Sequence, residues 1–275
     1  MRDSEFEFIR SLVYERSRIT LDHSKRELVA ARVGRRLREH NLDSVTDYCR
    51  LLQDPEHDEE RARLIDVIST NHTAFFREIA HFDFLIRRIA AEVRARGRPP
   101  LQAEYRAWSA ACSSGEEAYS IGMTLADQLA GTPWGWRVEA TDISRPMLEA
   151  AAAAIYPQEA VRSVTPAWAR RYFLRGIGPQ TGNWRVKPAI REGVVFRQLN
   201  LLAGPPPFAE PFDLIFCRNV MIYFDASTQE QLLAHLVEKL VPGGYLMIGH
   251  SESLPRIKGA LERIQPSVYR RRLAA

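Results

Sequence analysis

The sequence predicts an α/β fold with a doubly wound, mostly parallel sheet, preceded by an all-helical domain and interrupted by a small antiparallel insert. Three observations predict it. Apolar residues recur at spacings of three and four through residues 1–97, as in amphipathic helices. Beyond them, short apolar runs alternate with helical patterns, as in a parallel sheet with crossover helices. Residues 156–192 break this alternation with two short strand-like pieces around a glycine-rich turn.

The helical domain is predicted from positions such as Phe6, Ile9 and Val13, which recur at helical spacing. The segment GRPP at 97–100 is a turn signal and a plausible boundary. We therefore expect a helical domain with its linker at 1–97 and a second domain at 98–275, with the insert at 156–192 inside the second domain.

The second domain is predicted element by element. Helices are expected at 116–130, from Ser144 onward and at 227–240, the last ended by the segment VPGG. Strands are expected at 104–110, 136–142, 193–200, 212–217, 244–250 and 267–273. Ligands of such sheets bind beyond the carboxyl ends of the strands, so the turns after 110, 141, 199 and 217 should surround one crevice.

Composition and charge limit the classes of function that the chain can have. The 275 residues carry a net charge of +4, and residues 25–38 alone hold six basic residues against one acid. Such localised charge indicates an acidic partner at one surface rather than general nucleic-acid binding. No apolar run approaches the ~18 residues of a membrane span, and the N-terminus lacks a signal-peptide core. The three cysteines are far apart and have no metal-binding spacing, so we expect no metal site. A reducing, cytoplasmic compartment is the simplest inference from this cysteine usage.

Two motifs lie at the predicted crevice. The strand–turn–helix junction SACSSGEEAYS at 109–119 lets backbone N–H groups approach a ligand, but its single glycine, Gly115, does not suit a dinucleotide. A plain helix-capping box is the alternative explanation of this segment. Asp142 ends the next strand, where an acid commonly holds the hydroxyls of a ribose, unless it only helps to start the following helix.

The segment CRNVMIYF at 217–224 places three polar side chains, Arg218, Asn219 and Tyr223, in apolar surroundings at the end of a strand. The alternative is a surface ion pair and a core tyrosine. The segment GHSES at 249–253 is similar to a hydrolase nucleophile elbow, but Ser253 replaces the second glycine and no helix follows. We therefore do not predict a hydrolase.

Five stretches occur in the order typical of one known family: residues 71–78, 108–121, 140–144, 175–182 and 212–224. Together they resemble the CheR-type chemotaxis receptor glutamate O-methyltransferases over nearly the whole chain. The resemblance implies an N-terminal helical domain, a class I methyltransferase sheet and an inserted β-subdomain. It also implies S-adenosylmethionine as methyl donor, S-adenosylhomocysteine as product, and receptor glutamates that become methyl esters during sensory adaptation.

The resemblance also implies site residues. Arg77 and Tyr223 would act on the reacting groups, with Arg77 lying with Asn71 and Thr73 on a helix over the cofactor. Glu117 would take the methionyl amino group and Asp142 the ribose. The remaining cofactor contacts would be Asn200, Leu201, Arg218 and Asn219.

Partners follow from charge and from the resemblance. Lys25, Arg32, Arg35 and Arg36 share one side of a predicted helix and should dock on acidic receptor helices, unless that face is merely solvated. The insert should hold a receptor C-terminal tether peptide, or else only pack on the main domain. We expect a monomer without nucleic acid or membrane insertion. Two alternatives remain: a methyltransferase with another acceptor, and a non-catalytic cofactor-binding relative.

Overall fold

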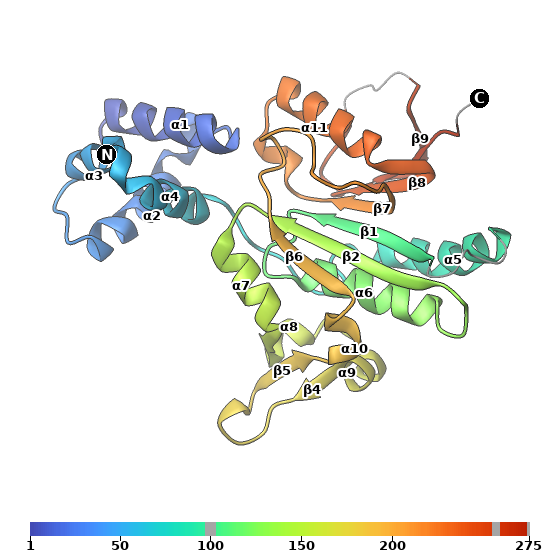
Figure 1. The fold of residues 1–275 in the computed structure, drawn as a ribbon. Coiled ribbons are helices and arrows are strands. Elements are labelled where there is room, and N and C mark those ends of the chain that lie inside the picture. Colours follow the sequence, from blue (N-terminus) through green and yellow to red (C-terminus); the bar gives the residue numbers. More distant parts are fainter. Residues whose placement is uncertain (97–102, 255–258, 274–275) are drawn as a thin grey trace. The chain divides into compact units, whose positions relative to one another are not determined.

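The computed structural model describes residues 1–96, 103–254 and 259–273 (Figure 1). It divides into two compact units, each with its own apolar core. The smaller unit comprises Met1–Thr70 with Ile222–Gln229, and the larger comprises Asn71–Met221 with Glu230–Ala275. This division differs from the predicted boundary at residue 97, because helix α5 (Ile79–Ala95) packs beside α6 (Glu116–Gln128) in the larger unit. The turn predicted at 97–100 lies outside the described residues.

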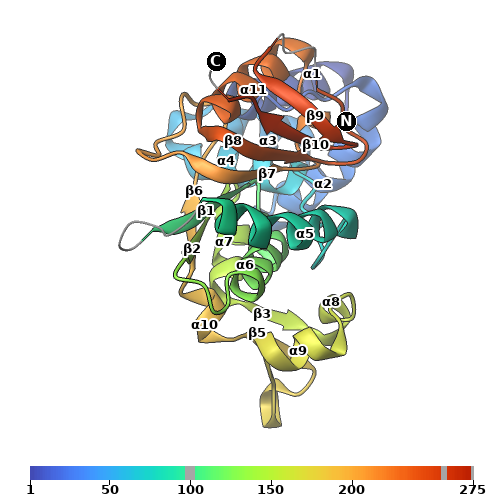
Figure 2. The same cartoon turned by 90° about the vertical axis from the view of Figure 1, so that its right-hand side faces the viewer.

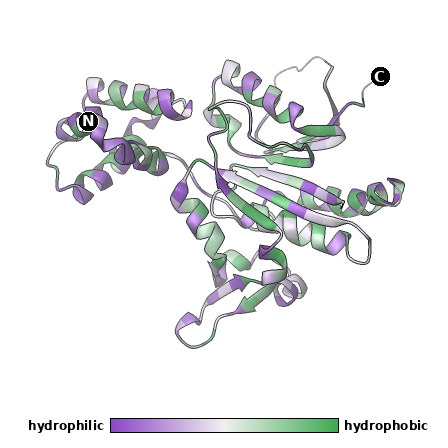
Figure 3. Ribbon diagram, viewed as in Figure 1, coloured by the Kyte–Doolittle hydropathy of each residue, from purple (hydrophilic) through white to green (hydrophobic). Residues whose placement is uncertain are grey.

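The smaller unit is built from helices α1 (Asp3–Ser17), α2 (Arg26–Glu39), α3 (Val45–Gln53) and α4 (Asp58–Ile68). Phe6, Ile9 and Val13 of α1 are fully buried, and they pack in one core with Val29 and Val33 of α2. Hydrophilic and hydrophobic residues alternate along these helices (Figure 3). The helical periodicity read from the sequence is therefore confirmed for this unit.

A seven-stranded sheet forms the centre of the larger unit, in the order β6-β2-β1-β7-β8-β10-β9 (Figures 1 and 2). Strand β1 pairs in parallel with β2 and with β7, so the strand order reverses beside β1. The last two strands are antiparallel to their neighbours. The predicted doubly wound, mostly parallel sheet is confirmed. The strands are β1 (Glu104–Ala110), β2 (Gly135–Asp142), β6 (Val194–Gln198), β7 (Phe212–Cys217), β8 (Leu240–Ile248), β9 (Leu261–Gln265) and β10 (Val268–Arg271).

Two further helices complete this alternation, α7 (Arg145–Ala153) and α11 (Ala226–Glu238). Ser144 caps α7 as predicted, since its side chain accepts a hydrogen bond from the backbone of Met147. The prediction that VPGG ends the helix at 227–240 is wrong, because these residues lie inside β8. An irregular register between β7 and β8 and the positive φ of Gly243, +82°, accommodate the proline and glycines within a strand. Strand β9 was not predicted.

The insert forms a separate three-stranded antiparallel sheet in the order β3-β5-β4, which Figure 1 shows at the bottom. Its strands are β3 (Ile155–Pro157), β4 (Phe173–Arg175) and β5 (Asn183–Val186), with short helices α8 (Gln158–Val161), α9 (Pro166–Tyr172) and α10 (Pro188–Arg191). The two predicted strand pieces are β4 and β5. Gly176 is required in the turn between them, because a Cβ atom there would lie 1.9 Å from the carbonyl oxygen of Gln180. Within the described residues, no helix has the length and apolarity to cross a membrane.

Candidate active site

The loop after β1 meets the end of β2, as the parallel topology requires. The backbone of this loop is unusual, with left-handed φ values at Ala111, Ser113 and Gly115. Gly115 is the N-cap of α6, and a Cβ atom there would lie 2.8 Å from the Cβ atom of Ala151. The junction therefore needs its single glycine for close helix packing. The capping-box alternative is not what the structure shows, since no side chain caps α6.

Asp142 ends β2 with its carboxylate buried against two backbone donors. The backbone N–H of Ser113 donates to Oδ2 at 2.8 Å, and that of Ser144 donates to Oδ1 at 2.9 Å. Because the side chain is only 6% exposed, burial raises the pKa of this carboxyl above its ordinary value. The contact with Ser144 shows that Asp142 does help to start α7, and its link to Ser113 joins it to the β1 loop.

Glu117 connects the first turn of α6 to two strands. Its Oε1 accepts a 2.6 Å hydrogen bond from the hydroxyl of Ser109 in β1. Its Oε2 accepts a 2.8 Å hydrogen bond from Nε of Arg218, directly after β7. All three side chains are buried, so the pair is a desolvated, charge-assisted interaction rather than a surface contact. The turns after residues 110 and 217 were expected to border one crevice, and this ion pair joins the elements that follow them.

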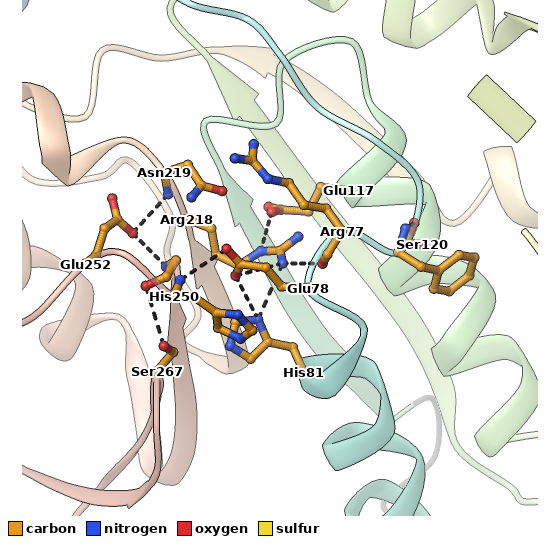
Figure 4. A network of polar contacts seen from close by, with 12 residues as sticks. Arg77, Glu78, His81, Glu117, Ser120, Arg218, Asn219, His250, Glu252 and Ser267 are labelled. Atoms are coloured by element: carbon orange, nitrogen blue, oxygen red, sulfur yellow. Dashed lines mark hydrogen bonds and ion pairs between the residues drawn. The ribbon is translucent and has the colours of Figure 1, made fainter. Parts of the chain in front are cut away.

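Arg218 is the centre of the polar network in Figure 4. Its side chain is 1% exposed, and its guanidinium lies over the rings of Phe82 and Phe216. Besides Glu117, its Nη1 donates to the carbonyl oxygen of Arg77 at 2.5 Å and lies 3.4 Å from Oε2 of Glu78. The alternative of an ordinary surface ion pair is therefore wrong for Arg218.

Two histidines adjoin this network, and sequence reasoning missed them. His81 is fully buried, and its Nδ1 lies 3.4 Å from Nη1 of Arg218. Burial, and then the positive charge of Arg218, lower the pKa of His81 to about 4, so the ring is neutral at pH 7. Glu78, His81 and His250 offer possible metal ligands within 4.8 Å of one another. The guanidinium of Arg218 already contacts two of these donors, and the expectation of no metal stays a prediction.

The segment 71–78 is not helical, so the prediction that Asn71, Thr73 and Arg77 lie on a helix is wrong. Helix α5 begins only at Ile79, because the backbone is left-handed at Phe76 and Glu78. The same three residues nevertheless lie in one turn-rich segment of the larger unit, and each is half-buried.

Tertiary hydrogen bonds hold that segment against the β1–α6 junction. The carbonyl oxygen of Asn71 accepts a 2.9 Å hydrogen bond from the hydroxyl of Ser113, and the backbone N–H of Phe76 donates to the hydroxyl of Ser120. The guanidinium of Arg77 donates to the carbonyl oxygen of His72 at 2.9 Å. The structure thus brings Asn71 beside the loop that binds Asp142.

Asn200 and Leu201 follow β6 and adjoin the end of β2. The backbone N–H of Leu199 donates to the carbonyl oxygen of Asp142 at 2.9 Å. The amide oxygen of Asn200 accepts from the backbone of Leu202 at 3.0 Å, while Leu201 is buried. These residues therefore lie along the same strand-end edge as Asp142.

The two polar residues after Arg218 divide between the units. Asn219 lies in the larger unit with a left-handed φ of 59°. Tyr223 belongs to the smaller unit, where its carbonyl oxygen accepts a 2.8 Å hydrogen bond from the backbone N–H of Thr20. The expected role of Tyr223 beside the reacting groups stays a prediction.

The four basic residues expected to dock on a receptor have different environments. Lys25 and Arg35 are exposed. Arg32 is half-buried and donates to the carbonyl oxygens of Ile68 and Ser69 at the end of α4. Arg36 is 6% exposed, so the prediction that it contacts a receptor is wrong.

Arg36 instead has a structural partner. Its Nε donates to Oε1 of Glu60 at 2.8 Å, and Glu60 also accepts from the hydroxyl of Tyr48 at 2.6 Å. The guanidinium of Arg36 is therefore part of a buried ion pair in the smaller unit.

Comparison with known proteins identifies the family. The family described as "CheR methyltransferase, SAM binding domain" matches residues 71–270, and "CheR methyltransferase, all-alpha domain" matches residues 4–69. The chain belongs to the CheR methyltransferase family. The junction between these two domains falls where the two compact units divide, at Thr70. The larger CheR unit, with its sheet and the network around Arg218, is thus a domain for binding S-adenosylmethionine.

Three curated relatives of this CheR chain are all named as chemotaxis protein methyltransferases. The "Chemotaxis protein methyltransferase" of Escherichia coli (strain K12) is 44% identical over 269 residues, covering 98% of this chain and 91% of that protein. "Chemotaxis protein methyltransferase 2" of Pseudomonas aeruginosa is 39% identical, with coverages of 96% and 92%. The "Chemotaxis protein methyltransferase" of Borreliella burgdorferi is 37% identical, with coverages of 94% and 91%. The predicted family is therefore confirmed, and the chain is an S-adenosylmethionine-dependent methyltransferase.

Proposed function

We propose that this protein transfers a methyl group from S-adenosylmethionine to the side-chain carboxylate of specific glutamates on chemotaxis receptors, forming glutamyl methyl esters. The observation that carries the proposal is the set of buried ionic groups Asp142, Glu117 and Arg218 along one sheet edge. It occurs in a chain that is 44% identical, over nearly its full length, to a protein named for chemotaxis methylation.

The strand-end residues suit the cofactor chemically. S-adenosylmethionine supplies a methyl group on a positively charged sulfonium. The carboxylate of Asp142 has acceptor capacity beyond its two backbone donors and would accept from ribose hydroxyls. Glu117 would accept from the methionyl amino group while Arg218 balances its charge. The other cofactor contacts are proposed to come from Asn71, Thr73, Arg77, Asn200, Leu201, Arg218 and Asn219.

The acceptor needs orientation more than activation. A glutamate carboxylate has a reference pKa of about 4.3, so it is already ionised and nucleophilic at pH 7. No general base is required, and His81, neutral in its buried position, is not proposed as one. Arg77 is the proposed carboxylate ligand, because a guanidinium can hold a carboxylate in two-point contact. Tyr223 is proposed to frame the methyl group and the acceptor.

Two surfaces are proposed for the receptor. Lys25 and Arg35, which are exposed on the basic segment, would dock on acidic receptor helices. The insert would bind a receptor C-terminal peptide by strand addition, since β3 and β4 are both edges of its sheet. Leu174 of β4 and Ile177 beyond it are 50% and 84% exposed and would supply apolar contacts. Such tethering would raise the local enzyme concentration near its substrate. We further propose a cytoplasmic monomer.

The test is incubation with radiolabelled S-adenosylmethionine and receptor-bearing membranes, followed by mild alkali. Methyl esters hydrolyse and release volatile methanol, whereas methyl groups on nitrogen stay on the product. Alkali-labile label on the receptor band supports the proposal. Alkali-stable label on nucleic acid would favour another acceptor, and cofactor binding without any transfer would favour a non-catalytic relative.

A further inference from the structure

The loop after β8 contains the segment GHSES at 249–253, whose similarity to a hydrolase motif explains nothing about this site. We propose that Glu252 in this loop is a positioning residue, which holds the segment 218–221 in the conformation that receives the cofactor. The inference rests on the proposed function, in that Arg218 and Asn219 are taken to line the cofactor.

Glu252 gathers backbone donors from two loops. Its Oε2 accepts from the N–H groups of Asn219 at 2.9 Å and Gly249 at 2.6 Å, and its Oε1 accepts from the N–H of Met221 at 2.9 Å. Figure 4 shows this carboxylate beside Asn219, on the far side of Arg218 from Glu117. Hydrogen bonds from N–H groups to a carboxylate are stronger than neutral ones, so this contact sets the path of the backbone after β7.

That path has an external support. Asn219 has a φ of 59°, a left-handed conformation that is uncommon outside glycine, although asparagine adopts it more readily than most residues. Such a conformation persists where surrounding contacts determine it. The carboxylate of Glu252 binds the N–H of Asn219 itself and, two residues on, that of Met221. It therefore fixes the turn in which Arg218 and Asn219 leave the strand.

Gly249 makes the close approach possible. A Cβ atom at this position would lie 2.5 Å from Nδ2 of Asn219 and 2.9 Å from Oε2 of Glu252. The next residue is held by a second carboxylate, because the backbone N–H of His250 donates to Oε1 of Glu78 at 3.1 Å. Oε2 of Glu78 in turn lies 3.4 Å from Nη1 of Arg218. The loop is thus held by two carboxylates, those of Glu252 and Glu78.

The first experiment follows the conformation of the cofactor-free protein. Backbone amide hydrogen exchange, measured by mass spectrometry on peptides covering 218–221 and 249–252, compares wild type with Glu252→Gln. The amide of glutamine turns an N–H group toward at least one of the three backbone donors, so exchange should accelerate in these peptides and stay unchanged in β1 and β2. Ser253→Ala, in an exposed neighbour on the same loop, is the matched control and should behave as wild type.

The second experiment measures binding by calorimetry with S-adenosylhomocysteine and with methylthioadenosine, which lacks the amino-acid portion. Affinity of Glu252→Gln for S-adenosylhomocysteine should fall about tenfold, as expected for one lost charge-assisted hydrogen bond. Affinity for methylthioadenosine should change less than about threefold, because Asp142 and the β6 loop are untouched. A uniform loss for both ligands would indicate general destabilisation and would overturn the assignment.

A second variant keeps the proposal testable if Glu252→Gln does not fold. Gly249→Ala retains the carboxylate but displaces Asn219, and it should show the same local exchange and the same ligand selectivity. Unchanged exchange at 218–221 in both variants would refute the positioning role. If wild type itself does not bind S-adenosylhomocysteine, the proposed function fails, while the exchange comparison still decides whether Glu252 holds the segment.

Discussion

Glu116 and Glu117 are adjacent buried acids in the first turn of α6, 7% and 6% exposed, yet their environments predict opposite responses to the same isosteric change. Glu117 accepts from Arg218 and Ser109, whereas Glu116 accepts from the hydroxyl of Ser114. Replacing each glutamate by glutamine alters the charge and one hydrogen-bonding group while keeping the volume. The pair therefore tests whether the buried ion pair with Arg218 stabilises the protein.

The expected change in stability depends on which buried charge each variant leaves without a partner. Glu117→Gln leaves the buried guanidinium of Arg218 without its nearest carboxylate, and removing one partner of a buried pair costs about 3–5 kcal/mol. Arg218 keeps the carbonyl oxygen of Arg77 and the more distant Glu78, so we expect the lower end, about 3 kcal/mol. For a unit of this size, that loss lowers the melting temperature by about 6–12 °C.

Glu116→Gln should have the opposite sign. Burial raises the pKa of Glu116 above its ordinary value of 4.5, so its ionised form costs stability. This cost is absent below the ordinary value and grows as the pH rises through the raised pKa. Glu116→Gln should therefore be at least as stable as wild type at pH 8, and any gain should shrink toward pH 4.

Thermal and urea unfolding at pH 8 and pH 5, with binding of S-adenosylhomocysteine measured on the same preparations, provide the assay. We expect Glu117→Gln to lose both stability and affinity, and Glu116→Gln to lose no stability at pH 8. Equal melting temperatures for the two variants would refute the reasoning, because the ion pair with Arg218 would then contribute nothing that its neighbour lacks.

Three further predictions concern other residues of the two units. Asp142→Ala should weaken S-adenosylhomocysteine binding by about 10- to 150-fold, through loss of charge-assisted hydrogen bonds worth about 1.5–3 kcal/mol, and unchanged affinity in calorimetry would exclude the ribose role. Arg77→Ala should keep its circular dichroism spectrum but transfer little methyl, whereas near-normal turnover would remove it from the site. Arg36→Met should destabilise the smaller unit by about 3–5 kcal/mol in urea unfolding, because Glu60 keeps its buried charge without its partner. The control Arg35→Glu should only raise the KM for receptor. Equal stability of the two variants would contradict the buried role of Arg36.

Much of the larger unit could be predicted because its signals are local. Strand β7 was predicted with its observed bounds, since a segment that is apolar except for Asp213 is best placed in the centre of a sheet. The meeting of Asp142 with the β1 loop followed from topology alone, because the carboxyl ends of neighbouring parallel strands lie at one edge.

The errors arose where distant contacts override local preference. A helix over 71–78 was expected from the family resemblance, but this segment has a left-handed backbone at Phe76, whose N–H donates to the hydroxyl of Ser120, 44 residues away. In the sequence, Arg36 looks like one member of an exposed basic face. In the structure, its guanidinium is buried against the carboxylate of Glu60. Glu252 contacts Asn219 across 33 residues, and no local pattern marks that pairing. A single sequence shows the spacing of residues along a helix or strand, but not which charge will find a partner.

The eight residues Ile222–Gln229 belong to the smaller unit although they lie far along the chain from Met1–Thr70. They form hydrogen bonds with the N-terminal part of this unit. The hydroxyl of Tyr14 donates to the carboxylate of Asp225 at 2.8 Å, and the backbone N–H of Thr20 donates to the carbonyl oxygen of Tyr223. On the ribosome, the four N-terminal helices emerge first and can begin to fold as a unit. Their last partners arrive only after residues 71–221 have been synthesised, so the smaller unit cannot be complete before four strands of the sheet, β1, β2, β6 and β7, have been translated.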